Sequence, residues 1–258
     1  MSASFEYLVV ERAEDLLRVR INRPDKRNAL SRAVLSELAN AFSLHAGDTS
    51  LKAAVLTGAG DKAFAAGGDL REFAALRSEQ DAAELFSDAH RALEQVRRFP
   101  VPVIAALNGL AVGGGAELAL ACDFRVAAAH AALGFVQGRL NISTGFGGGA
   151  DLMRLLGASR GLLCALRAEV LAAADARSAG LIDEVANESE SLEQCVMRFL
   201  EPIRRQVPQV IRSYKAMALA ERQGMGDDER FRVELAGFVE TWTHADHWAA
   251  ADRVLAKS

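Results

Sequence analysis

The sequence has few cysteines, no long apolar run and no excess of one charge, and each scarcity excludes a class of protein. Its three cysteines, Cys122, Cys164 and Cys195, are an odd and widely spaced set, which predicts free thiols rather than a disulfide framework or a metal cluster. No uninterrupted apolar stretch reaches membrane-spanning length, and the first residues lack the basic and apolar segments of a secretory leader. We therefore expect a cytoplasmic protein with no membrane partner.

The balance of charge excludes a further class. The net charge is -4, with a quarter of the 258 residues charged, which disfavours nucleic-acid binding through bulk charge. A polyanionic ligand would need a local site. Half of the residues are hydrophobic, so the chain can bury a large core as one domain with a helical appendage.

The spacing of apolar residues predicts alternating strands and helices, and hence an α/β fold. Strands are expected at 16–21, 53–58, 101–107 and 124–126, and helices at 31–45, 81–99 and 113–123. Beyond 185 no strand-like run remains, and a capping box at 191–194 opens a helix. We therefore expect a core at 1–190 and a helical region at 191–258.

Glu117 is the residue that most needs an explanation. It is a single carboxylate in an otherwise apolar helix that begins at Gly113, Gly114 and Gly115. An ionised carboxylate on an apolar face costs roughly several kcal/mol unless it is paired, so it tends to neutralise or to serve chemistry. A structural salt bridge is the other explanation. The glycines favour catalysis, because they let backbone N–H groups approach a ligand closely.

A second segment of small residues, 63–70, places Gly67 and Gly68 before Asp69. By itself this segment predicts only a loop and a helix start. Together, however, two glycine-rich segments can supply two N–H groups to one oxyanion, the geometry that stabilises a carbonyl as it gains negative charge.

Taken together, the segments 65–70 and 108–118 resemble the crotonase superfamily, the enoyl-CoA hydratase and isomerase family. The segments 22–24 and 28–30, 145–149 and 179–185 also occur at their places in the family's order. The resemblance implies a ClpP-like spiral of ββα turns with a helical C-terminal region that packs across subunits. It also implies a homotrimer or a dimer of trimers, an acyl-CoA thioester substrate and no separate cofactor.

The resemblance also implies roles for individual residues. The backbone N–H groups of Gly68 and Gly114 would form the oxyanion hole for a thioester enolate, and Glu117 would be the catalytic glutamate. Hydratases of the family place a second glutamate twenty residues later, where this chain has Gln137. An amide can orient substrate or water but does not exchange a proton at neutral pH. We therefore expect a site with a single catalytic glutamate.

The reaction itself stays open between hydration, isomerisation and decarboxylation. Loss of CO2 from a malonyl-type thioester leaves an enolate without any base, and then needs only the oxyanion hole and a proton donor. The chain also has a partial likeness to alkylmalonyl-CoA decarboxylases of the ethylmalonyl-CoA type. Decarboxylation is therefore the alternative activity within the family.

The resemblance also points to residues near the CoA moiety. Lys26 and Arg27 are candidates for its phosphates, and Ala65, Ala66 and Asp69 are candidates for the rest of the ligand. From a neighbouring subunit, the weaker candidates are Arg253 and Lys257. No cluster of residues implies a metal or a redox cofactor.

Two further classes of function remain as alternatives. Ser143 precedes Thr144 and Gly145 in a near match to G-x-S-x-G, which keeps a serine hydrolase open, although no histidine has the sequence context of its base. A non-catalytic acyl-CoA-binding protein is the other alternative, because the second acid is missing. The residues 145–150 fit G-x-G-x-x-A, but the polar segment before them disfavours a dinucleotide site. Likewise, His244 and His247 lack further ligands for a metal.

Overall fold

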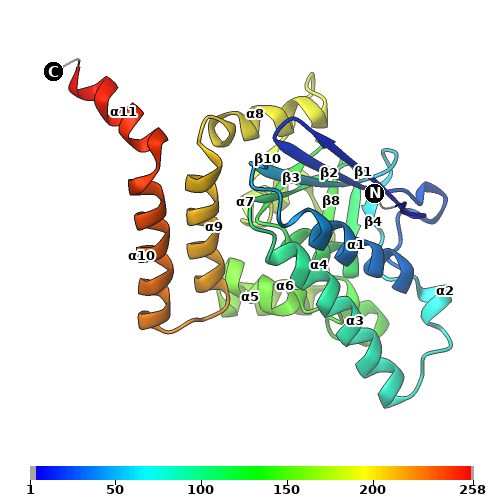
Figure 1. Cartoon of the computed structure of the whole chain (residues 1–258). Coiled ribbons are helices and arrows are strands. Elements are labelled where there is room, and N and C mark those ends of the chain that lie inside the picture. The colour runs from blue at the N-terminus through cyan, green and yellow to red at the C-terminus, as the bar shows by residue number, and fades with distance from the viewer. Residues whose placement is uncertain (1–3, 257–258) are drawn as a thin grey trace.

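Two sheets form the framework of the molecule in the computed structural model, which describes residues 4–256 (Figure 1). The larger sheet has the strand order β1-β2-β3-β5-β7-β10, and the smaller one has the order β4-β6-β8-β9. The strands are β1 (Leu8–Ala13), β2 (Leu16–Ile21), β3 (Ala53–Gly58), β4 (Ala63–Ala65), β5 (Val103–Leu107), β6 (Leu110–Val112), β7 (Phe124–Ala127), β8 (Ala132–Gly134), β9 (Leu171–Ala172) and β10 (Glu184–Val185).

Helices surround these sheets and make up the C-terminal part of the chain. The α-helices are α1 (Arg32–His45), α2 (Leu70–Phe73), α3 (Glu79–Arg97), α4 (Gly114–Ala121), α5 (Gly148–Leu156), α6 (Ala158–Arg167), α7 (Ala173–Ser178), α8 (Leu192–Arg204), α9 (Pro208–Arg222), α10 (Asp227–Thr243) and α11 (Ala245–Leu255). Two short 3-10 helices, η1 (Pro24–Lys26) and η2 (Gln137–Leu140), lie in connections.

Successive strands alternate between the two sheets. In the pairs β3 and β4, β5 and β6, and β7 and β8, the first strand joins the larger sheet and the second joins the smaller one. Within each sheet these strands are parallel to their neighbours, because a helical segment returns the chain each time. The alternation confirms the predicted spiral of ββα turns.

Helices α1, α3 and α4 cover one face of the larger sheet, and α8 covers part of the other. Along β2, Leu17, Val19 and Ile21 belong to the main core with α1, α3 and α4, whereas Leu16 belongs to a second core with α8. This division follows the two-residue period of a strand. The side chains of the central strands β3 and β5 are almost all buried, as the apolar runs of these strands predict.

Most of the predicted elements are confirmed. The helix expected at 31–45 begins at Arg32, and the Ser31 side chain caps it by accepting a hydrogen bond from the Val34 N–H. The capping box at 191–194 opens α8. The prediction did not include β1, whose last three residues are exposed, or the three-residue strands of the smaller sheet.

The three cysteines are free thiols, as expected. Cys122 is fully buried, and burial raises the pKa of its thiol to about 12. Among the helices of the described part of the chain, none combines the length and the apolar character needed to cross a membrane.

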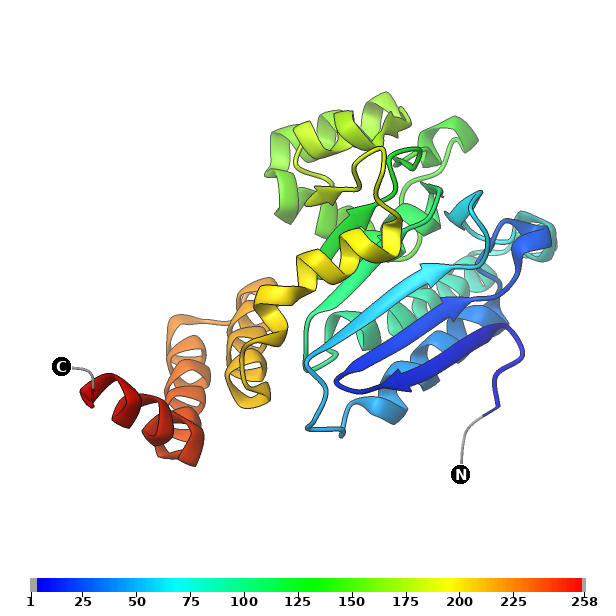
Figure 2. The ribbon, with the colours of Figure 1, turned by 90° about the horizontal axis from the view of Figure 1, so that it is seen from above.

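The C-terminal helices leave the body of the molecule. Helix α8 packs on the larger sheet, but α10 and α11 stand away from both sheets (Figures 1 and 2). Helix α10 packs against α9 so closely that a Cβ on Gly237 would lie 2.0 Å from the Ser213 Oγ. Large apolar side chains on α10 and α11 remain exposed, among them Phe231, Phe238, Trp242 and Trp248.

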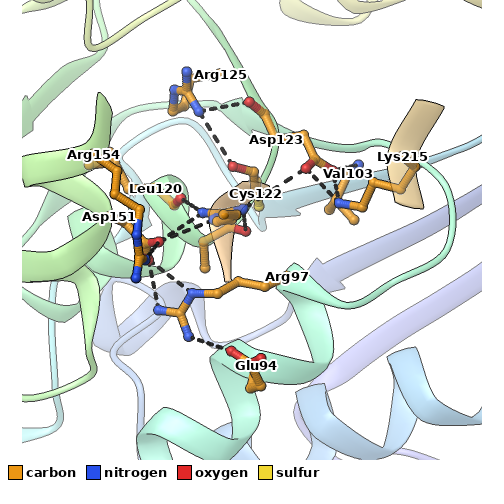
Figure 3. A network of polar contacts seen from close by, with 12 residues as sticks. Glu94, Arg97, Val103, Leu120, Cys122, Asp123, Arg125, Asp151, Arg154 and Lys215 are labelled. Atoms are coloured by element: carbon orange, nitrogen blue, oxygen red, sulfur yellow. Dashed lines mark hydrogen bonds and ion pairs between the residues drawn. The ribbon is translucent and has the colours of Figure 1, made fainter. Parts of the chain in front are cut away.

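A buried ionic network attaches α9 to the body (Figure 3). Arg97 of α3 donates two hydrogen bonds to Asp151 of α5, at 2.9 and 2.7 Å. Arg222, at the end of α9, donates to the other Asp151 oxygen and to the backbone oxygens of the last turn of α4. Lys215 of α9 pairs with Asp123 at 2.5 Å. The network therefore joins α9 to α3, α4 and α5.

Candidate active site

Helix α4 begins where the chain leaves β6, in very close contact with β4. A Cβ on Gly115 would lie 1.9 Å from the Ala65 backbone oxygen, so only glycine fits at this crossing. The preceding Gly113 has a φ of 56°, which glycine adopts without strain. All residues of α4 are buried. The three glycines therefore let the start of the helix lie directly against the smaller sheet.

The two glycine-rich segments lie side by side, as expected of a shared site. A Cβ on Gly67, which has a φ of 100°, would lie 3.2 Å from the Val112 backbone oxygen and 3.8 Å from the Gly114 nitrogen. Within residues 4–256, no group accepts a hydrogen bond from the N–H of Gly68 or of Gly114. Two backbone donors are therefore available in the same small region.

Glu117 is buried, with 1% of its surface exposed, and its carboxylate accepts four hydrogen bonds. Oε1 accepts from the Gln137 Nε2 at 2.9 Å and from the Gly145 N–H at 3.2 Å. Oε2 accepts from the N–H groups of Phe146 and Gly148, both at 2.8 Å. These four donors fill the usual hydrogen-bonding capacity of a carboxylate.

The surroundings of Glu117 act on its pKa in opposite directions. Burial raises the pKa above its ordinary value, and the four hydrogen bonds favour the ionised form and oppose the rise. No lysine or arginine in the described residues forms a salt bridge with Glu117. The carboxylate instead accepts from the first N–H of α5, so it also caps that helix.

Gln137 meets Glu117 in space, although twenty residues separate them in sequence. The side chain is 8% exposed and comes from the start of η2. Its nitrogen donates to Glu117, while its Oε1 is buried and has no hydrogen-bond partner among residues 4–256. The site therefore contains one buried acceptor that the protein does not satisfy.

The predicted ligand-side turn lies beside the second glycine segment. The Ala66 N–H donates to the Arg27 backbone oxygen at 3.1 Å, and the Leu30 N–H donates to the Gly67 oxygen at 2.8 Å. Lys26 and Arg27 are exposed at this turn, whereas Ala65 is buried in β4.

The side chain of Asp69 already has structural partners. It caps α2 by accepting from the Glu72 N–H, and it pairs with Arg23 at 3.1 Å. Partial burial opposes the effect, but the hydrogen bonds hold the pKa of Asp69 below its ordinary value. Arg253 is exposed on α11, and Lys257 lies outside the described residues.

The residues considered for a serine hydrolase or a metal site do not come together in the structure. Ser143 is exposed, and none of the described histidines forms a hydrogen bond with it. His244 caps α11 through its Nδ1, which accepts from the Asp246 N–H at 3.2 Å. The described residues contain no group of three or more histidine, cysteine or acidic side chains placed to hold a metal ion.

Comparison with known proteins identifies the family. A family model described as enoyl-CoA hydratase/isomerase matches residues 11–253. The chain belongs to this family. The crotonyl-CoA hydratase of Syntrophomonas wolfei is 36% identical over 191 residues, which are 74% of this chain and 73% of that protein. The 2,3-dehydroadipyl-CoA hydratase of Escherichia coli is 40% identical over 187 residues, which are 72% of this chain and 71% of that protein.

A solved structure supports the same assignment for the whole chain. The enoyl-CoA hydratase from Bacillus anthracis superposes with a TM-score of 0.89 at 32% identity, and the match covers 98% of this chain and 97% of that one. The chain is thus an enzyme of the enoyl-CoA hydratase/isomerase family with the family's fold.

Two aromatic side chains at the site of this hydratase/isomerase family member were not predicted. A Cβ on Gly114 would lie 2.5 Å from a ring carbon of Phe146, and one on Gly68 would lie 2.7 Å from a ring carbon of Phe73. The rings therefore cover the two glycines. The sequence carried one signal, a lone aromatic residue within the glycine run 145–149, but only the fold shows what that ring touches.

Proposed function

We propose that the enzyme acts on acyl-CoA thioesters through an enolate whose oxygen is bound by the N–H groups of Gly68 and Gly114. The observation that carries the proposal is the pair of unpartnered backbone donors next to a buried carboxylate. Fixed donors in a water-poor site stabilise the charge that develops on a thioester oxygen. The hydratase names of the relatives are consistent with this chemistry.

In this proposal Glu117 is the only group that transfers a proton. For hydration, the water oxygen bonds to C3 of the enoyl group, the water proton passes to Glu117, and the π electrons move to the thioester oxygen. Glu117 then returns the proton to C2, so that one carboxyl group completes the addition. To act in this way it must exchange one hydrogen bond for the substrate, and the 3.2 Å bond from Gly145 is the longest of the four.

Decarboxylation is the second candidate reaction. Four donors occupy the Glu117 carboxylate, so a reaction that starts without a base requires no change in these hydrogen bonds. Loss of CO2 from a malonyl-type thioester breaks the C2–carboxylate bond and leaves the electron pair on the enolate without deprotonation. Only the final protonation of C2 then requires an acid.

The proposal extends to the rest of the ligand and to assembly. Lys26 and Arg27 are exposed beside the glycine segment, where their charges can meet the CoA phosphates.

The exposed apolar residues of α10 and α11 are suited to an interface between copies of the chain, and we propose a homotrimer or a dimer of trimers.

A substrate panel separates the candidate reactions. The enzyme is incubated with crotonyl-CoA, a 3-enoyl-CoA and ethylmalonyl-CoA, and the products are identified by mass. Hydration adds the mass of water, decarboxylation removes the mass of CO2, and isomerisation leaves the mass unchanged but moves the double bond. If none of the three thioesters is converted to a product, the proposed function is wrong.

Replacement of Glu117 by glutamine tests the proton-transfer role. Because the amide cannot exchange a proton at neutral pH, we expect kcat to fall on the order of 10²-fold or more. The control is Glu193→Gln, an exposed carboxylate on α8 that pairs with Arg18, which should leave kcat unchanged. If Glu117→Gln has the same kcat as the wild-type enzyme, Glu117 does not transfer the proton.

A further inference from the structure

Strand β1 is the outermost strand of the larger sheet, so one of its edges has no neighbouring strand (Figure 2). Its six residues pair with β2 in an unbroken antiparallel register. The Asn22 N–H donates to the Tyr7 backbone oxygen, and in an antiparallel pair every second residue bonds to the neighbouring strand. The residues that alternate with these, Leu8, Val10 and Arg12, therefore direct their backbone N–H and C=O groups to the open edge.

The open edge of β1 lacks the features that often block such an edge. Proteins protect edge strands with a proline, a bulge or a charged side chain that points into the edge. Strand β1 has no proline and no bulge, and the Arg12 side chain is paired with Asp48 at 3.2 Å. Within residues 4–256, no group accepts a hydrogen bond from the N–H of Leu8, Val10 or Arg12. The edge can therefore pair with another strand.

The same hairpin carries two unpaired charges of opposite sign, Glu11 and Arg20. Both are exposed and line a groove on the face of the sheet that carries α8, and within residues 4–256 neither side chain forms an ion pair or a hydrogen bond. Arg18, which lies opposite Glu11, pairs with Glu193 of α8 at 2.5 Å instead. Arg20 lies opposite Val9, next to the open edge. Since strands lie about 4.8 Å apart, a carboxylate just beyond Val9 is within reach of the long Arg20 side chain.

A second copy of β1 can pair with this edge about a twofold axis. The outward-facing residues of the two copies bond only when they lie opposite one another, so the register can shift only in steps of two residues. With Val10 opposite Val10 of the second copy, Leu8 meets Arg12 and every outward-facing residue is bonded. A shift that places Val10 opposite Arg12 also places Glu11 opposite Glu11, and like charges in that position destabilise a sheet. The opposite shift leaves Arg12 beyond the end of the other strand.

We propose that β1 pairs with β1 of a second copy of the chain, in the register that places Val10 opposite Val10. In this register Glu11 of one copy lies opposite Val9 of the other, where it forms an ion pair with Arg20. The twofold axis repeats this ion pair and closes the contact, which is isologous. The inference rests on the proposed assembly, because the exposed face of α10 and α11 would hold three chains together and the β1 contact would join two such trimers.

Removal of one N–H group tests the strand pairing. Val10→Pro deletes a donor that faces the open edge, and an edge strand tolerates proline at such a position. We expect the mass from size-exclusion chromatography with light scattering to be half that of the wild-type protein, three chains in place of six. The control is Val10→Ala, which keeps the N–H group and should keep the wild-type mass.

A mixture of two charge variants tests the register. Glu11→Arg brings two guanidinium groups together across the axis, and Arg20→Glu brings two carboxylates together, so each variant alone should have half the wild-type mass. When the two variants are mixed in equal amounts, each altered side chain meets the opposite charge on the other variant. The wild-type mass should then return, which requires contact between positions 11 and 20 of different copies.

The outcomes distinguish this contact from the proposed trimer. A wild-type mass of three chains, or an unchanged mass in Val10→Pro, would overturn the β1 contact and leave the trimer in place. A mixture of the charge variants that stays at half the wild-type mass would overturn the register and its ion pair. A wild-type mass of two chains that falls to one in Val10→Pro would support the β1 contact and contradict the trimer. The charge variants decide the question if Val10→Pro does not fold.

Discussion

At the scale of single residues, Phe146 limits the space next to the two glycine N–H groups. Its backbone N–H donates to Glu117, and its ring packs against the α-carbon of Gly114, so one residue contacts both the carboxylate and the glycine that carries a proposed oxyanion donor. Only 5% of its surface is exposed. A thioester bound at Gly114 would therefore have the ring close to C2.

We predict that Phe146→Leu widens the range of acyl groups. The smaller side chain leaves room beside C2, so the kcat/KM for 2-methylcrotonyl-CoA should rise about tenfold relative to that for crotonyl-CoA, the lower end of the scale of one methyl group in an apolar pocket. Steady-state kinetics with both substrates measures this ratio. Phe199→Leu, in the contact between α8 and β7, is the matched control. An unchanged ratio would show that the ring does not border the acyl group.

Glu117 has a structural role that the sequence did not reveal. The predicted alternatives were catalysis and a salt bridge, but the carboxylate caps α5 and accepts from three backbone N–H groups of that region. A Cβ on Gly148 would lie 2.5 Å from the Glu117 Cβ, so glycine at this position is what allows the contact. The pairing depends on two segments that only the tertiary structure brings together.

At the scale of elements, α4 is fixed at both ends and α5 is fixed at its first turn. Their N-termini meet at Glu117, and Arg222 of α9 bonds the last carbonyl groups of α4 and also Asp151 of α5. A cation at the C-terminus of α4 also complements the helix dipole. The relative position of the two helices therefore depends on a residue outside both of them.

We predict that Arg222→Met destabilises the protein and slows turnover. The variant leaves helix carbonyl groups without donors, so unfolding should require about 1–3 kcal/mol less free energy. Since α4 and α5 position Glu117, kcat should fall several-fold with little change in KM. Urea denaturation and steady-state kinetics measure the two effects. Arg230→Met, which removes exposed ion pairs on α10, should change neither.

At the scale of elements, part of the fold could be predicted from the sequence. The buried strands β3 and β5 and the amphipathic helix α1 were predictable, because apolar spacing records which face is buried. The glycine segments indicated an oxyanion site through their order in the chain. Long-range contacts were not predictable, because the ring of Phe146 on Gly114 and the guanidinium of Arg222 on α4 leave no periodic signal.

At the scale of the whole molecule, the exposed face of α10 and α11 requires an explanation. Phe238 is 55% exposed, and Trp242 and Trp248 are each nearly half exposed. The Trp242 ring contacts the rings of both Phe238 and Trp248, so the three side chains form one continuous apolar surface. Apolar patches of this kind mark sites of association.

We predict that Phe238→Asp disrupts assembly. A carboxylate at the centre of a buried interface has no partner, so the measured mass should shift from three or six chains towards one. Size-exclusion chromatography with light scattering gives the mass directly. Leu44→Asp, at an equally exposed leucine on α1, should leave the mass unchanged. A monomeric wild-type protein would contradict the proposed trimer.

The two free donors at Gly68 and Gly114 belong to the main chain, and this has an evolutionary consequence. No substitution other than one to proline removes a backbone N–H, so this part of the site is inherited together with the fold. Gln137 and Phe146, by contrast, contribute side chains to the site, and substitution can change these. New reactions can therefore arise in this family by few substitutions, each acting on an enolate that the fold already stabilises.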